Sequence, residues 1–87
     1  MTMKIHLRFF AGVREALGSG AETVTLPDHV RSVGAVRDWL RERGEPWGAT
    51  LAPAQSLRMA YDHTMTEADT PIAEGGEVAF FPPVTGG

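Results

Sequence analysis

Apolar and polar residues alternate most clearly near the two ends of this chain. From residue 3 to residue 10 every second side chain is apolar, namely Met3, Ile5, Leu7 and Phe9. A period of two is typical of a strand with one buried face. At the other end Gly75-Gly76 favours a turn, and a second apolar run predicts the final strand over residues 77–81. The chain therefore begins and ends with strands.

A period of three to four replaces this alternation in the middle of the chain. One apolar stripe is formed by Val33, Val36 and Leu40. Ser32 precedes the stripe and is a favoured N-cap, whereas Gly44 favours a left-handed C-terminal turn and Pro46 prevents continuation. The sequence predicts the main helix over residues 33–43. Its charged side chains are expected on the water-facing side, namely Arg37, Asp38, Arg41 and Glu42.

The remaining segments are shorter. We predict a single helical turn within residues 11–17, a strand over residues 23–26, an irregular or short helical connection over residues 47–54, and a strand around residues 57–61. Asp62-His63 favours a hairpin turn that leads to a short return strand at residues 64–65. Ile72 is expected to plug the core from a loop.

These elements occur in the order strand, strand, helix, strands. Half-buried strands and a one-sided helix bury their apolar faces together, which predicts an α+β domain of two layers. The order fits a β-grasp, in which a mixed sheet is covered by one main helix. We expect the first and last strands side by side at the centre of the sheet, because they are the most apolar.

Composition narrows the classes of function. The chain has 87 residues and no cysteine, which excludes a disulfide, a cysteine-bound zinc and a thiol nucleophile. Its net charge is −3, so we expect no binding to nucleic acid, which requires clustered Lys and Arg. There is no membrane-length apolar stretch and no signal peptide, so we expect no membrane contact and a cytoplasmic location.

The end of the chain is its most informative segment. Its last ten residues, VAFFPPVTGG, carry no charge. Pro82-Pro83 restricts the backbone beyond the last strand, and Gly86-Gly87 leaves the tip without side chains. We predict a folded domain over residues 1–81 and a flexible tail over residues 82–87, whose free carboxylate can enter another protein.

Two phenylalanines each stand second in a Phe-Phe pair at a strand end. Alternation turns Phe10 and Phe81 away from the side used by Phe9 and Phe80. Two interpretations stay open for the outward rings: packing beneath a loop at the edge of the domain, or an apolar docking patch for partner proteins. Arg14 is a candidate for the polar rim of such a patch.

Other candidate sites are weaker. His6, His29 and His63 lack the spacing of metal ligands, so no metal is assigned. Gly18-Ser19-Gly20 lacks the continuation of a phosphate loop and is interpreted as a turn. After Arg58 the chain holds no Lys or Arg. It holds five acids there, namely Asp62, Glu67, Asp69, Glu74 and Glu77. These acids either keep loops soluble or form an acidic rim that steers the tail toward basic partners.

A resemblance to a known family is carried by the opening MKIHLRFFAGVREALG, the single helix and, above all, the ending GGEVAFFPPVTGG. These features resemble the small subunits of molybdopterin synthase, a family of ubiquitin-like sulfur carriers with a β-grasp fold. The resemblance runs from Met3 to Gly87. Two departures concern turns: Gly76 stands where the family often has Asp, and Tyr61-Asp62 replaces a frequent Val-Asn.

The resemblance implies that an activating enzyme adenylates the Gly87 carboxylate with ATP and that a sulfur-donor protein converts it to a thiocarboxylate. The tail, kept thin by Gly86, then enters the large subunit of a heterotetramer and gives sulfur to a pterin precursor of the molybdenum cofactor. The chain itself binds no cofactor and is the non-catalytic subunit. Residues implied in partner contacts are Phe10, Arg14, Phe81, Pro82, Pro83, Val84 and Thr85.

Alternatives stay open. The chain fits a sulfur carrier for another product, such as the thiazole of thiamine or an amino acid. It also fits a protein modifier that forms isopeptide bonds, or a noncovalent binding module. Pathway neighbours in the genome separate the first alternative from a molybdopterin synthase subunit, and lysine conjugates would favour the modifier.

Overall fold

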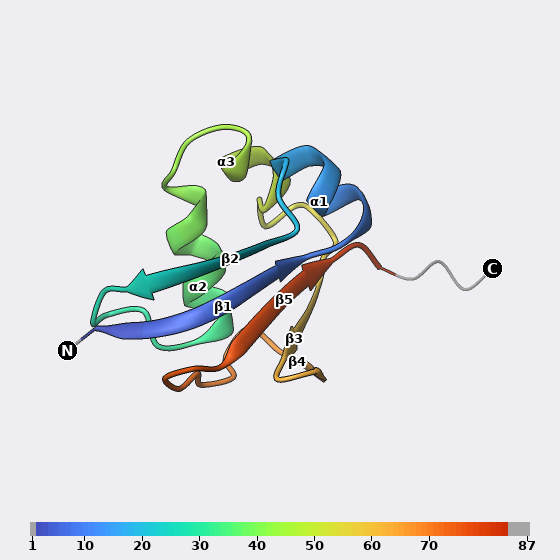
Figure 1. Ribbon diagram of the computed structural model, residues 1–87. Coiled ribbons are helices and arrows are strands. Elements are labelled where there is room, and N and C mark those ends of the chain that lie inside the picture. Colours follow the sequence, from blue (N-terminus) through green and yellow to red (C-terminus); the bar gives the residue numbers. More distant parts are fainter. Residues whose placement is uncertain (1, 84–87) are drawn as a thin grey trace.

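A mixed sheet forms the body of the protein, as a computed structural model describes it for residues 2–83. Its strands are β1 (Met3–Phe9), β2 (Ala21–Leu26), β3 (Arg58–Tyr61), β4 (Thr64–Thr66) and β5 (Glu77–Phe81). They lie in the order β2-β1-β5-β3-β4, and β1 runs parallel to β5 while the other neighbours are antiparallel. The predicted central pairing of the first and last strands is confirmed (Figure 1).

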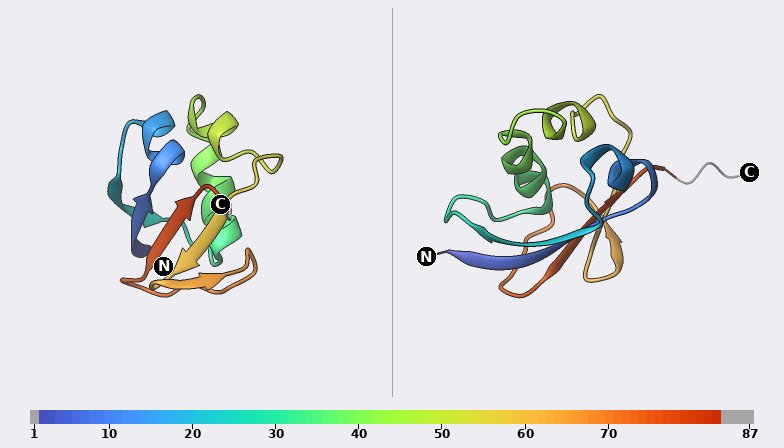
Figure 2. Two further views of the ribbon diagram at one scale, coloured as in Figure 1. Left: turned by 90° about the vertical axis from the view of Figure 1, so that its right-hand side faces the viewer. Right: turned by 45° about the horizontal axis from the view of Figure 1, so that its top comes forward.

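Three helices lie on one face of the sheet (Figure 2). They are α1 (Ala11–Leu17), α2 (Val33–Arg41) and α3 (Trp47–Thr50). The predicted stripe of α2 is fully buried and packs in one core cluster with the inward side chains of the sheet, among them Ile5, Leu7, Phe9, Val78 and Phe80. Ile72 is also buried, as predicted. None of the helices within residues 2–83 has the length and apolar character needed to cross a membrane.

The start of the chain differs from the prediction in two places. α1 is a seven-residue helix rather than a single turn, because Val13 anchors it in the core and Gly18 ends it in the left-handed conformation with φ 74°. β2 begins at Ala21 rather than at residue 23, because its pairing with β1 continues as far as Arg8. Both elements are longer than predicted, because the core contact of Val13 and the pairing with β1 extend them.

The limits of α2 follow the predicted capping chemistry closely. The Ser32 hydroxyl oxygen accepts a hydrogen bond from the N–H of Ala35 at 3.1 Å, as expected of an N-cap. The helix ends at Arg41, two residues before the predicted end, and the chain continues as a turn. Gly44 closes this turn with the predicted left-handed φ of 89°.

The prediction that Arg37 lies on the water-facing side of α2 is wrong. Its guanidinium donates hydrogen bonds to the backbone oxygens of Leu51, Ala52 and Gln55, at 2.6, 2.6 and 3.1 Å. Burial lowers the pKa of Arg37 below its ordinary value. Charge alone predicts exposure, but a guanidinium has enough donors to satisfy several loop carbonyls at once. Arg37 therefore holds the connection between α3 and β3 against α2.

Arg43 joins three elements just beyond the end of α2. Its two terminal nitrogens donate to the two carboxylate oxygens of Glu22 on β2, at 3.0 and 2.7 Å. This hydrogen bonding lowers the pKa of Glu22 below its usual value. The guanidinium carbon also lies 4.5 Å from the centre of the Trp47 ring and 5.7 Å from that of Trp39. The corner between α2 and α3 is thereby tied to the edge strand of the sheet.

The two departures from the family pattern lie against each other in space. A Cβ atom added to Gly76 would lie 2.6 Å from Cε1 and 2.7 Å from Cζ of the Tyr61 ring, closer than side-chain atoms pack. The ring is held in place because its hydroxyl oxygen accepts a hydrogen bond from the N–H of Ala73 at 2.7 Å. Gly76 does not have a left-handed φ, so the lack of space requires glycine here.

We expect Gly76→Asp to lower the free energy of unfolding by about 1–3 kcal/mol, because the new side chain displaces the Tyr61 ring. In a Tyr61→Val background the same change is less costly, giving a coupling energy of about 1 kcal/mol or more. Denaturant unfolding of both single variants and the double variant measures this coupling. Gly12→Ala is the control, because nothing lies within 4 Å of its added methyl group. Equal costs of Gly76→Asp in the two backgrounds would contradict steric coupling.

Candidate functional site

The sheet face away from the helices carries two rows of side chains across neighbouring strands. One row consists of Phe10, Phe81 and Arg58. The next row consists of Arg8, Ala79, Ala60 and Met65. We call these seven residues the open face. Of the large apolar side chains in the described part of the chain, Phe10 and Met65 stand out as exposed, at 41% and 56%. Apolar surface is therefore concentrated where the last strand ends.

Phe10 and Phe81 form an aromatic pair on the open face. Their rings meet edge to face, with centres 6.3 Å apart and planes at 82°. On the other side of the sheet, Phe9 and Phe80 stack in the core with centres 6.1 Å apart. Strand alternation thus turns one Phe of each pair inward and the other outward, as the sequence predicts. A docking role for the outward pair stays a prediction.

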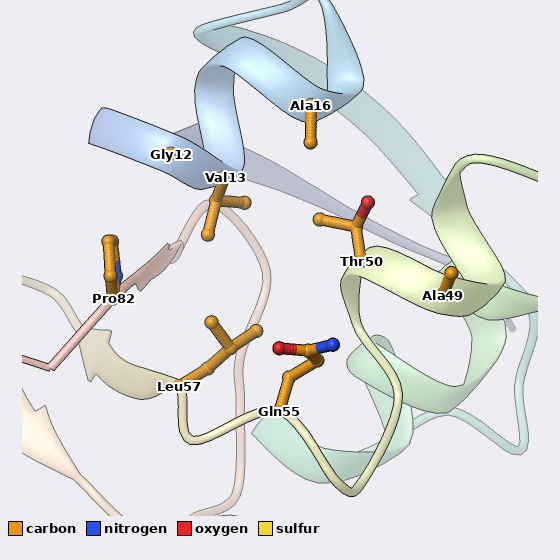
Figure 3. A pocket seen from close by; sticks show the side chains of 8 residues that line it. All are labelled: Gly12, Val13, Ala16, Ala49, Thr50, Gln55, Leu57 and Pro82. Carbon is orange, nitrogen blue, oxygen red and sulfur yellow. The ribbon is translucent and has the colours of Figure 1, made fainter.

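Pro82, the first residue of the predicted tail, lines a mainly apolar groove of about 380 Å³. Figure 3 shows the side chains that surround it, which come from α1, α3 and the connection to β3. Pro83 is exposed. The other tail residues to which a role was assigned, Val84, Thr85, Gly86 and Gly87, lie outside the described residues, so the division at residue 81 stays a prediction. The tail leaves the domain between the groove and the open face.

Arg14 is linked to Phe10 through the backbone, because its N–H donates a hydrogen bond to the carbonyl oxygen of Phe10 at 3.3 Å. The Arg14 side chain lies along the turn from α1 to β2, where a Cβ added to Gly20 would come within 3.0 Å of its Nε atom. The cation over the Phe10 ring is Arg8, whose guanidinium carbon lies 5.4 Å from the ring centre. Arg8 therefore occupies the rim position that the sequence prediction assigned to Arg14, and a partner contact by Arg14 stays a prediction.

Besides the two alanines, sequence reasoning missed three large side chains of the open face, namely Arg8, Arg58 and Met65. The signal for Arg8 was present, because the alternation that turns Phe10 outward also turns Arg8 to the same side. Met65 and Arg58 depend on the pairing of β3 with β4 and β5, which no local pattern specifies. These two positions could be found only from the fold.

The histidines and acids do not gather into a metal centre within residues 2–83. The Nδ1 atom of His6 lies 3.0 Å from the hydroxyl oxygen of Thr23. His63 lies beside Glu77, with Nδ1 3.6 Å from Oε2. These groups form local surface contacts and bring no nucleophile, base and acid together.

Three of the five acids that follow Arg58 lie at the end of the sheet where β5 begins, namely Asp62, Glu74 and Glu77. Glu74 accepts a hydrogen bond from the backbone N–H of Lys4 at 2.9 Å, near the start of β1. Asp62 accepts one from the backbone N–H of Glu77 at 2.9 Å, at the start of β5. Since β1 and β5 are parallel and Phe81 ends β5, these acids do not surround the root of the tail. The interpretation as a steering acidic rim does not hold for them.

Nearly the whole length of the chain matches a known family and relatives with a name. The ThiS family matches residues 7–87. Two relatives, from Escherichia coli and Haemophilus influenzae, are 39% and 35% identical to this chain over 83 residues, which is 95% of this chain and 99% of each relative. Both are named molybdopterin synthase sulfur carrier subunit. The resemblance to this group of proteins is confirmed.

Solved structures confirm the predicted ubiquitin-like β-grasp. A ubiquitin of Caldiarchaeum subterraneum superposes with a TM-score of 0.58 at 18% identity, and each chain is covered completely. A chain from a complex of subunits 1 and 2 of the molybdopterin-converting factor from Helicobacter pylori gives a TM-score of 0.61 at 22% identity, with 98% of this chain and 100% of that one covered. Fold and family match agree along the chain, and we conclude that this protein belongs to the ThiS family.

Proposed function

We propose that this chain is the sulfur-carrier subunit of a molybdopterin synthase and that the Gly87 carboxylate is the group that carries sulfur. The proposal is carried by one observation: the central strand β5 leads directly into Pro82-Pro83 and a Gly-Gly terminus without charged side chains, next to an aromatic pair of which Phe10 is exposed. The names of the two relatives, whose matches cover 95% of this chain, support it.

The chemistry follows from the poor reactivity of a carboxylate. In the first step a Gly87 oxygen attacks the α-phosphorus of ATP, and pyrophosphate leaves. The outer sulfur of a persulfide on the donor protein then attacks the acyl carbon, and AMP departs with the carboxylate oxygen. A thiol cleaves the S–S bond of the resulting acyl disulfide and forms a disulfide with the donor's sulfur, which leaves the thiocarboxylate on Gly87. ATP belongs to the activating enzyme, and this chain holds no cofactor. The acid and base groups for both steps are expected on the partners.

The carrier with its terminal thiocarboxylate then docks on the large subunit, which acts on the pterin precursor. Phe10 and Phe81 form the contact patch, while the tail from Pro82 onward enters the active site of the large subunit. A chain with the same fold was solved in the complex of subunits 1 and 2 from Helicobacter pylori, which supports a partner of this kind. We expect two copies of each subunit in the assembled enzyme.

Intact-mass measurement tests the proposal. After incubation with ATP, the cognate activating enzyme and a sulfur source, we expect the mass to rise by the difference between sulfur and oxygen, with fragmentation placing the sulfur on Gly87. The reaction without ATP is the control and should leave the mass unchanged. Sulfur on another residue would contradict the mechanism. If the chain acquires the thiocarboxylate but does not convert the pterin precursor together with its large subunit, it would belong to another sulfur-transfer pathway.

A further inference from the structure

The open face combines an apolar centre with two arginines. Ala79 and Ala60 lie side by side in the sheet and are only 6% and 8% exposed, so they form a low floor between larger neighbours. Arg8 lies beside Ala79 on β1, and Met65 lies beside Ala60 on β4. Arg58 lies next to Phe81 in the adjacent row. Arg8 and Arg58 thus lie at diagonally opposite corners of the two rows, with Ala79 and Ala60 between them.

The charge of this face is opposite in sign to that of the chain, whose net charge is −3. The described strands hold two acids, and Glu22 faces the helix side, where Arg43 binds it. Glu77 remains on the open side of β5, one row beyond Arg8 and already beside His63. Its Oε1 atom lies 4.0 Å from Arg8, at the outer limit of an ion pair. On the open face itself the charged side chains are Arg8 and Arg58, while Glu67 and Asp69 line one hollow together with Arg58 and Met65 at its β4 edge.

Both guanidinium groups are accessible to a partner. The Arg8 side chain is 45% exposed and lies over the Phe10 ring, which restricts its orientation. Arg58 is exposed and, within residues 2–83, forms no ion pair. A guanidinium binds a carboxylate with two parallel hydrogen bonds, so a carboxylate is its best-matched partner on a protein surface. Part of the ordering of Arg8 is already present in the free chain.

We infer that Arg8 and Arg58 bind two carboxylates of the large synthase subunit, placed on either side of an apolar side chain that sits over Ala60 and Ala79. This inference rests on the proposed function, because it names the surface chemistry of the partner in that assembly. The paired carboxylates fix the register of docking and favour a partner with acids at this spacing over one without them.

Charge reversal tests the inference. We expect Arg8→Glu and Arg58→Glu each to weaken binding to the large subunit of the same organism by about tenfold or more, since a new carboxylate would face an existing one. Arg31→Glu is the matched control: it changes net charge equally but lies in the loop before α2 and should leave affinity nearly unchanged. Equal losses in all three variants would show a general charge effect and overturn the inference.

A chemical cross-link identifies the carboxylates directly. Arg8→Lys and Arg58→Lys keep the charge and supply an amine, which a carbodiimide couples to a neighbouring carboxylate as an amide. We expect peptides from each variant joined to Asp or Glu of the large subunit, and none from Arg31→Lys. Absence of such peptides in a complex that still forms would overturn the inference.

Different binding results would overturn the proposed function and the carboxylate inference. If an unchanged chain does not bind the large subunit at all, the proposed function fails and this inference fails with it. If the unchanged chain binds, Phe81→Asp abolishes binding and both arginine reversals bind normally, the sulfur-carrier assembly stands and only the carboxylate inference is overturned. For the unchanged chain we expect affinity to fall as the salt concentration rises from about 0.05 to 0.5 M. This dependence on salt should be smaller for the variant with both arginines reversed.

Discussion

Deletion of Gly87, or Gly86→Val, is expected to abolish sulfur transfer while the thermal midpoint changes by less than about 2 °C. Adenylation and transfer both require the carboxylate to reach a reactive centre inside another protein, and a β-branched side chain widens the chain at that point. Within residues 2–83 the core includes Val78 and Phe80 but no residue beyond β5, so we expect it to tolerate these changes. Thiocarboxylate formation by mass spectrometry and unfolding by calorimetry measure the two quantities.

Deletion of Thr2 is the matched control, since it removes one residue near the other chain end, just before β1, whose start lies at the end of the sheet opposite to the end of β5. That variant should carry sulfur normally. A large drop in the thermal midpoint on loss of Gly87 would mean that the tail stabilises the domain, and the reagent role of the terminus would lose its basis.

A charged residue in place of Phe81 or Phe10 should weaken binding to the large subunit by about 2 kcal/mol or more, roughly thirtyfold in affinity. Aromatic anchors dominate many interfaces, and an Asp at either position would be desolvated on docking. The effect on the free chain should be smaller, because Phe10 is 41% exposed and Phe81 half-buried. Calorimetric titration against the large subunit, with an unfolding curve for each variant, separates the two effects.

Thr25→Asp serves as the control for added charge on the same side of the sheet. Thr25 lies on β2 opposite Lys4, away from the aromatic pair, and is exposed. This variant should bind with nearly unchanged affinity. If Phe81→Asp also binds normally, or if its unfolding explains the whole loss, the two rings serve only to pack the end of the sheet.

Periodicity predicted the elements that bury one face against the core. The alternation of Ile5, Leu7 and Phe9 and the helical spacing in α2 each leave one arrangement that removes all apolar side chains from water. The same parity argument placed Phe10 and Phe81 outward, because consecutive residues of a strand point to opposite faces. Those predictions depend on local sequence alone, and they are correct.

Contacts between distant segments could not be predicted in this way. Arg37 has the appearance of a surface charge on its helix, yet the carbonyls it binds come from a loop more than ten residues later. The fit of Tyr61 against Gly76 depends on β3 lying beside β5. For the same reason Met65 and Arg58 joined the candidate site only once the sheet order was known.

The position of β5 favours resistance of the domain to a pull on its C-terminal end. β5 is bonded on one side to β1 and on the other to β3, and it continues without a break into the tail. A partner that pulls on the tail loads both ladders along the strand axis, so their hydrogen bonds resist together in shear. An edge strand pulled sideways would instead open one bond at a time. The domain can therefore be drawn against the mouth of a narrow channel by its terminus without unravelling.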